Sequence, residues 1–160
     1  MDAVLIDSMG GDLTAVNAAR VSFAKKKEVM DEKDEKLIRY LASHKHWTPF
    51  GHIMLQFRIT APMFVARQWY RHTVGFARNE ESRRYISNTP NVYLPDYFRS
   101  KPEGSIKQGS AGVHEQSWAW KVNTANALNK CVELYNEMIS DGVAPEQARM
   151  VLPQGTETSW

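Results

Sequence analysis

The chain has 160 residues, 42% of them hydrophobic, which suffices for one compact globular domain. Twenty lysines and arginines against eighteen aspartates and glutamates give a net charge of +2, less than a nucleic-acid-binding protein usually carries. There is no apolar run of about 18 residues and no basic N-terminal leader, so we expect a soluble, cytoplasmic protein without membrane association. Five scattered histidines and one cysteine lack zinc-site spacing, and we predict no metal site.

The first sixty residues predict strands and helices in alternation. A short buried strand is expected at residues 4–6, then a turn at Gly10-Gly11 and a helix capped by Asp12. Residues 25–36 are highly charged and are expected to be solvated. A second helix follows, with an inner face formed by Leu37, Ile38 and Leu41. Clean alternation of apolar and polar residues over 53–60 predicts the clearest strand in the chain.

The second part of the chain is predicted to be mainly helical. Pro62 suits the first turn of a helix that we extend to about His72. Residues 101–112 are predicted to form a flexible connection, and residues 114–140 a long helix whose apolar stripe includes Cys131. We interpret Cys131 as a core residue rather than a reactive thiol. Pro145 opens a short helix, and residues 154–160 show no further element.

Residues 67–85 contain the highest density of side chains able to bind an anion. This stretch holds five arginines, two adjacent carboxylates, a histidine, and amide and hydroxyl donors. The planar fork of arginine matches phosphate and carboxylate, so the mixture predicts a site for a nucleotide phosphate and a pyrimidine ring. The flanking arginines favour ionised forms of Glu80 and Glu81. A structural network of ion pairs explains the same pattern equally well, and both readings stay open at this point.

Two residues outside that stretch have local explanations that compete with a binding role. Ser22 lies near the end of the first helix, where most serines only satisfy the backbone. His46 lies near the end of the second helix, where the helix dipole alone favours a histidine.

Five separated segments resemble one family, the flavin-dependent thymidylate synthases. These segments cover most of the chain in the family's order: MGGDLTAVNAARVSF at 9–23, HWTPFGH at 46–52, APMFVARQW at 61–69, the block from Arg71-His72 to NEESRRY at 79–85, and ARMVLP at 148–153. The resemblance implies an α/β fold of the α+β type, with a central, mostly antiparallel sheet packed with helices and one long C-terminal helix. It implies a single domain of this family over residues 1–160.

The resemblance also implies a reaction. The 5-position of dUMP receives the one-carbon unit of methylenetetrahydrofolate to give dTMP, reduced FAD delivers the hydride, and NADPH reduces the FAD. No enzymic cysteine attacks the substrate, which agrees with a core position for Cys131. Members resemble homotetramers in which subunits jointly build each flavin site, with small-molecule substrates and without nucleic acid as partner.

The resemblance assigns roles residue by residue. The residues that would bind the flavin cofactor are Ser22, His46, Thr48, Arg71, His72 and Glu80. Those that would bind the nucleotide are Gln68, Arg71, Glu80, Glu81, Ser82, Arg83, Arg84 and Arg149. The catalytic set is Ser82, Arg84 and Arg149, with Ser82 as an orienting donor because no evident base activates its hydroxyl. Catalysis would rest on positioning the flavin and polarising the uracil.

The chain departs from the family pattern at four points. Thr73 stands where the family's third signature residue is arginine, and the interval from His72 to Asn79 is one residue longer than usual, so that Arg78 is a candidate to replace the lost charge. Gly51 replaces a common glutamate. The family's further helical region after the segment matching 148–153 is missing, which predicts a fragment or a C-terminally truncated form.

Two other functions remain as alternatives. The first is a non-catalytic module that binds RNA or another polyanion through its arginines, against which the low net charge and the lack of an aromatic platform count. The second is an inactive, truncated member of the family that binds ligands without turnover.

Overall fold

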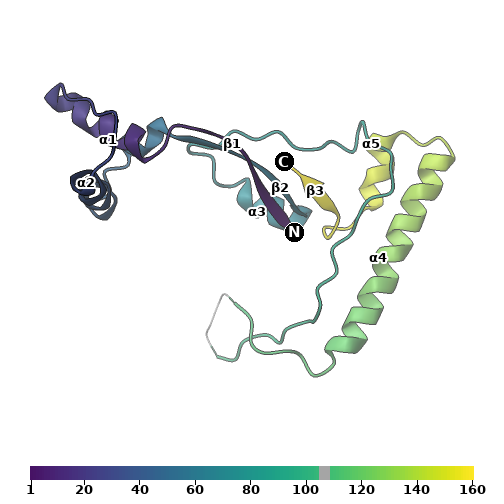
Figure 1. Cartoon of the computed structure of the whole chain (residues 1–160). Helices are drawn as coiled ribbons and strands as arrows, with labels where there is room; N and C mark the ends of the chain where they lie inside the picture. The colour runs from purple at the N-terminus through teal and green to yellow at the C-terminus, as the bar shows by residue number, and fades with distance from the viewer. Residues whose placement is uncertain (105–108) are drawn as a thin grey trace. The chain divides into compact units, whose positions relative to one another are not determined.

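The computed structural model describes residues 1–104 and 109–160 and divides the chain into two compact units (Figure 1). The N-terminal unit is Asp2–Ile59, and the C-terminal unit is Thr60–Trp160 together with Met1. Each unit is described by itself. The single family domain over 1–160 stays a prediction.

The N-terminal unit is built from short helices beside two strands. Its elements are β1 (Asp2–Met9), α1 (Asp12–Arg20), the 3₁₀ helices η1 (Val21–Phe23) and η2 (Thr48–His52), α2 (Glu32–Ser43) and most of β2 (Met54–Pro62). Helix α1 packs against η2 and α2, and Ala15, Val16 and Leu41 are buried. The two predicted strands exist as β1 and β2 and both predicted helices are confirmed, with Gly10 and Gly11 between β1 and α1, and Leu41 lies on the inner face as expected.

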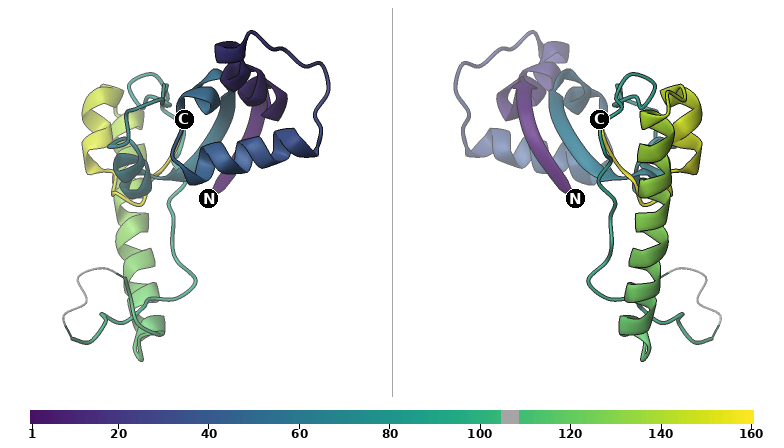
Figure 2. Two further views of the ribbon diagram at one scale, coloured as in Figure 1. Left: turned by 90° about the vertical axis from the view of Figure 1, so that its left-hand side faces the viewer. Right: turned by 90° about the vertical axis from the view of Figure 1, so that its right-hand side faces the viewer.

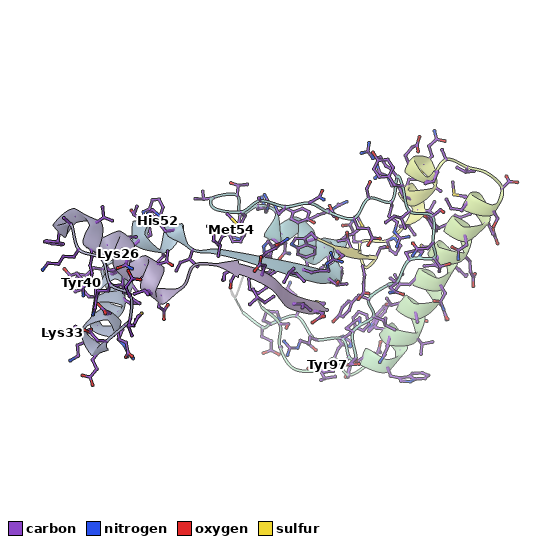
Figure 3. All side chains as sticks on the ribbon, turned by 45° about the horizontal axis from the view of Figure 1, so that its top comes forward. Lys26, Lys33, Tyr40, His52, Met54 and Tyr97 are labelled. Carbon is purple, nitrogen blue, oxygen red and sulfur yellow. The ribbon has the colours of Figure 1, made fainter. Side chains whose placement is uncertain are left out.

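Two expectations for the first strand and helix are wrong. Gly11, not Asp12, caps α1: its N–H donates to Thr14 Oγ1 at 3.1 Å, and its carbonyl accepts from the Thr14 N–H at 2.8 Å. The predicted strand at 4–6 is longer and is not buried, since Leu5 is 52% exposed and β1 is the edge strand of the order β1-β2-β3. Met54 at the start of β2, labelled in Figure 3, is 64% exposed.

A buried carboxylate joins the two helices of this unit. Asp34 has no exposed surface, and its two oxygens accept hydrogen bonds from Arg20 Nη2 and Lys27 Nζ. Asn17 holds the backbone of Lys27 through two hydrogen bonds of 2.9 and 2.8 Å. The expectation that residues 25–36 are simply solvated is thus wrong for Asp34, because α1 and the segment before α2 supply its partners. Asp31 caps α2 by accepting from the N–H groups of residues 33 and 34.

Replacing Asp34 by Asn is expected to lower the melting temperature at pH 7. The hydrogen bond from Lys27 is the main cause that holds the pKa of Asp34 well below its ordinary value, and Arg20 contributes further. A depressed folded-state pKa stabilises the fold above pH about 4, and this contribution is lost as pH falls. The difference in melting temperature between wild type and D34N should therefore shrink as the pH is lowered from 5 to 2 in a thermal melt series.

The exposed pair of Glu28 with Lys26 supplies the control for this series. Both side chains are largely in solvent at an N···O distance of 3.0 Å, so E28Q should change the melting temperature little at any pH. A D34N deficit that stayed constant across the pH range would contradict the role given to Asp34.

The C-terminal unit is dominated by one long helix. Its elements are the end of β2, α3 (Met63–Trp69), α4 (Ser117–Ser140), α5 (Pro145–Ala148), η3 (Arg149–Val151) and β3 (Glu157–Ser159). Strand β3 pairs antiparallel with β2 in the register Thr60↔Ser159 and Ala61↔Thr158. Helix α4 packs against α5 and η3, and α5 lies beside its C-terminal end (Figures 1 and 2). The antiparallel sheet with helices and the long helix confirm the predicted fold class.

Three predictions for this unit need correction or completion. Strand β3 was not predicted, because its three residues are polar and its partner lies about a hundred positions earlier. Helix α3 ends at Trp69 rather than His72, and Arg78 Nη1 donates to the His72 carbonyl at 3.0 Å beyond that end. The connection predicted at 101–112 includes residues 105–108, which lie outside the described residues. Among the helices described, none has the length and apolar character to cross a membrane.

Candidate functional site

A cavity of about 740 Å³ lies in the C-terminal unit. Four segments line it: α3, the irregular loop after it, the α5–η3 turn and the C-terminal segment that ends in β3. The lining residues are Met63, Arg67, Glu80, Glu81, Ser82, Arg83, Arg84, Glu146, Arg149, Met150, Leu152, Gln154, Thr156, Glu157 and Thr158. Residues 80–84 and residue 149, which are 65 positions apart or more, therefore share one site.

The lining of this cavity is balanced in charge. It combines four arginines, Arg67, Arg83, Arg84 and Arg149, with four glutamates, Glu80, Glu81, Glu146 and Glu157. The arginine-rich stretch alone suggested a cationic surface. The folded cavity instead offers both donors and acceptors, which suits a ligand that carries an anionic group as well as N–H or O–H donors.

The arginines differ in how the protein already uses them. Arg83 Nη1 donates to the carbonyl and Oδ1 of Asn88 at 2.6 and 2.9 Å, and its Nη2 lies 3.7 Å from Glu81. Arg84 donates to the Tyr85 hydroxyl and stacks on that ring. Arg149 donates only Nε, to the Glu146 carbonyl at 3.3 Å. Within the described residues the Nη groups of Arg149 have no protein partner, so they are available to a ligand.

Glu80 is held by a buried threonine at one side of the cavity. Thr158 Oγ1 on β3 donates to Glu80 Oε1 at 2.8 Å. The Tyr70 hydroxyl is also buried and has no hydrogen-bond partner in the described part of the chain. Burial, and then the charge of Glu80, raises the pKa of Tyr70 to about 12, so this phenol stays neutral at physiological pH.

A second, smaller hollow of about 300 Å³ lies in the N-terminal unit. Ser22 from η1, His46 before η2 and Thr48 at the start of η2 line it, together with His52 at the end of η2, which is labelled in Figure 3. The apolar rim comes from Ala18, Ala19, Leu41 and Pro49. Three of the residues predicted to bind the cofactor therefore meet in one place.

The structure gathers most predicted site residues and leaves three apart. The five predicted residues from Glu80 to Arg84 and Arg149 line the larger cavity, whereas Gln68, Arg71 and His72 are exposed and are not part of its lining. The helix predicted to extend to His72 ends at Trp69, so Arg71 and His72 lie beyond it. Their binding roles remain predictions.

Sequence reasoning assigned no specific role to three residues that the geometry adds. Arg67 lines the larger cavity, and its place in the arginine-rich stretch was a usable signal. His52 joins the smaller hollow, and its position at the end of the HWTPFGH segment pointed there. Thr158 gave no signal, because a polar residue near the chain end is ordinary. In the described residues no three His, Cys, Asp or Glu side chains cluster as metal ligands.

Comparison with known proteins identifies the family. Residues 4–160 match the family described as "Thymidylate synthase complementing protein". The flavin-dependent thymidylate synthase of Thermosipho africanus is 41% identical over 158 residues, which are 98% of this chain and 68% of that protein. The chain belongs to the flavin-dependent thymidylate synthase family.

Other relatives agree with this assignment. The enzyme of the same name from Thermotoga neapolitana is 41% identical over 150 residues, 93% of this chain and 63% of that protein. The UMP/dUMP methylase PolB from Streptomyces cacaoi, bound with 5-Br dUMP, superposes with a TM-score of 0.86 at 32% identity, covering 99% of this chain and 70% of PolB. A second PolB structure, bound with 5-Br UMP, gives a TM-score of 0.83. The predicted family is confirmed.

Proposed function

We propose that the protein makes dTMP from dUMP as a flavin-dependent thymidylate synthase, with methylenetetrahydrofolate as carbon donor and NADPH as reductant of the flavin. The observation that carries this proposal is the charge-balanced cavity formed by residues 80–84 and the α5–η3 turn. A nucleoside monophosphate has matching parts, since its phosphate requires cations and its uracil N3–H and sugar hydroxyl require acceptors.

The arginines that the protein leaves free would hold the phosphate. Arg149 and Arg67 line the cavity, and their terminal guanidinium nitrogens have no protein partner within the described residues. Arg84 is held beside them by Tyr85. Arg83 is a weaker candidate than the sequence suggested, because Asn88 already occupies its Nη1.

Activation of the uracil would come from positioning, not from covalent attack by the protein. Cys131 lies on α4 and is not among the residues that line the cavity. Ser82 lines it, but within the described chain its hydroxyl contacts only the Arg84 N–H, at 3.4 Å, and no base. Ser82 therefore serves as an orienting donor, and Arg84 and Arg149 stabilise negative charge on the substrate.

The smaller hollow of the N-terminal unit fits part of a flavin. Two hydroxyls and two imidazoles, from Ser22, Thr48, His46 and His52, supply donors for the polar edge or phosphates of FAD, beside an apolar rim. When bound, the reduced flavin supplies the hydride of the reaction. Arg71, His72 and Glu80 would complete the cofactor site, with residues from different subunits of a homotetramer contributing to each one.

The polyanion-binding alternative is disfavoured by the same cavity. Four glutamates among the lining arginines would repel the successive phosphates of RNA. PolB is named a methylase of both UMP and dUMP. These two nucleotides differ only in the 2′ hydroxyl, so any assay should compare them.

The test uses the full chain purified in the presence of FAD. A visible flavin spectrum, dUMP binding by calorimetry, and formation of dTMP with NADPH and methylenetetrahydrofolate are the expected results. UMP in place of dUMP measures discrimination at the 2′ position. Binding of FAD and dUMP without dTMP would identify an inactive member, and failure to bind either would refute the proposal.

A further inference from the structure

We propose that Thr158 is a positioning residue that fixes the Glu80 carboxylate for recognition of the nucleotide. This inference rests on the proposed function. It starts from the hydrogen bond of 2.8 Å between Thr158 Oγ1 and Glu80 Oε1. Thr158 is only 8% exposed, whereas Glu80 is an exposed residue that lines the cavity. A rigid, buried hydroxyl thus directs a carboxylate that solvent alone would leave free to rotate.

Strand β3 gives Thr158 its fixed position. Thr158 pairs with Ala61 of β2, and Glu157 pairs with Pro62. The next residue, Ser159, accepts a hydrogen bond from the Glu81 N–H at 2.8 Å. The strand therefore holds the loop twice, once through the backbone of Glu81 and once through the side chain of Glu80.

The chemical consequence concerns the second oxygen of Glu80. Oε1 accepts the hydrogen bond from Thr158. No hydrogen bond to Oε2 is present in the described part of the chain, so Oε2 remains available to accept one from a ligand. Besides burial, the charge of Glu80 contributes to the raised pKa of Tyr70, whose buried hydroxyl is near this carboxylate. On dUMP only the uracil N3–H and the 3′ hydroxyl are donors that a carboxylate can bind. Thr158 would thus orient Glu80 toward one of these two groups.

The experiment compares two variants that separate the hydroxyl from packing. T158V keeps the shape of the side chain and removes the hydroxyl, whereas T158S keeps the hydroxyl and removes a methyl group. T158V should weaken dUMP binding by calorimetry about tenfold, the usual scale of a hydrogen bond to a charged group, and T158S should stay near wild type. The KM for dUMP should rise with T158V while kcat changes little, since a binding contact is lost.

Thr60 provides a matched control. It lies on the same sheet, its hydroxyl contacts only Ser159 among the described residues, at 3.4 Å, and it does not line the cavity. T60V should therefore bind dUMP as the wild type does. In an E80Q background, adding T158V should cause less further loss than in the wild type, because the two residues act as one unit.

The outcomes are separable. Wild-type protein that does not bind dUMP would refute the proposed function and this inference with it. Wild-type binding of dUMP with an unchanged T158V affinity would refute only the role of Thr158. Equal losses of dUMP affinity in T158S and T158V would assign Thr158 to packing and overturn the inference. The same conclusion would follow if both variants melted at a lower temperature than the wild type and T158V lost affinity together with its fold.

Discussion

Replacing Arg149 by Ala is expected to lower kcat/KM for dUMP by about a hundredfold or more, the scale of losing a charged, forked contact to phosphate. Arg149 lines the cavity, and among the described residues its only hydrogen bond is from Nε to the Glu146 carbonyl, so its two terminal nitrogens have no competing protein partner there. R149K keeps the charge but loses the fork, and an intermediate loss of about tenfold is expected. Initial rates of dTMP formation at varied dUMP concentration measure both.

Arg99 supplies the control for that prediction. It carries the same charge in the same unit, donates to Ser110 and stacks near Tyr97, and does not line the cavity. R99A should therefore leave kcat/KM close to wild type. If R149A and R99A lost activity equally, the effect would reflect net charge and not a phosphate contact.

The local elements of this fold could be predicted from sequence because their signals are local. The alternation over 53–60, the apolar stripe before Ser140 and Pro145 at a first turn each depend on neighbours within a few residues. Strand β3 has no such signal. Its residues, Glu157, Thr158 and Ser159, are polar, and they are extended because they pair with β2 far away in the sequence.

The site, like the fold, could be predicted from sequence only where its signals are local. The arginine-rich stretch pointed to the loop at 80–84, and only the family resemblance tied Arg149 to it. What brings them together is tertiary packing: α4 packs against α5 and η3, and its Tyr135 hydroxyl donates to the Ile86 carbonyl just after the loop. The four glutamates of the lining come from three segments, so its balance of charge was invisible in the linear sequence. Asp34 was missed for a similar reason, since its partners Arg20 and Lys27 come from separate segments.

The second large effect is expected from replacing Tyr135 by Ala. Tyr135 lies in α4, has no exposed surface, and is the largest fully buried side chain in the described residues. Its hydroxyl donates to the Ile86 carbonyl at 3.3 Å, and so connects α4 to the segment that follows the 80–84 loop. Removing a buried aromatic ring leaves a cavity, and a loss of about 3–5 kcal/mol in the free energy of unfolding is expected in urea denaturation.

Two control variants make this measurement specific. Y135F removes only the hydroxyl, so a loss of about 1 kcal/mol is expected, which isolates the bond to Ile86 from the packing of the ring. Leu134, the adjacent residue on α4, is 46% exposed, and L134A should change stability by less than about 1 kcal/mol. If Y135A were no more destabilising than L134A, α4 would not be held by this residue, and another contact would have to keep α4 against the segment that carries the site.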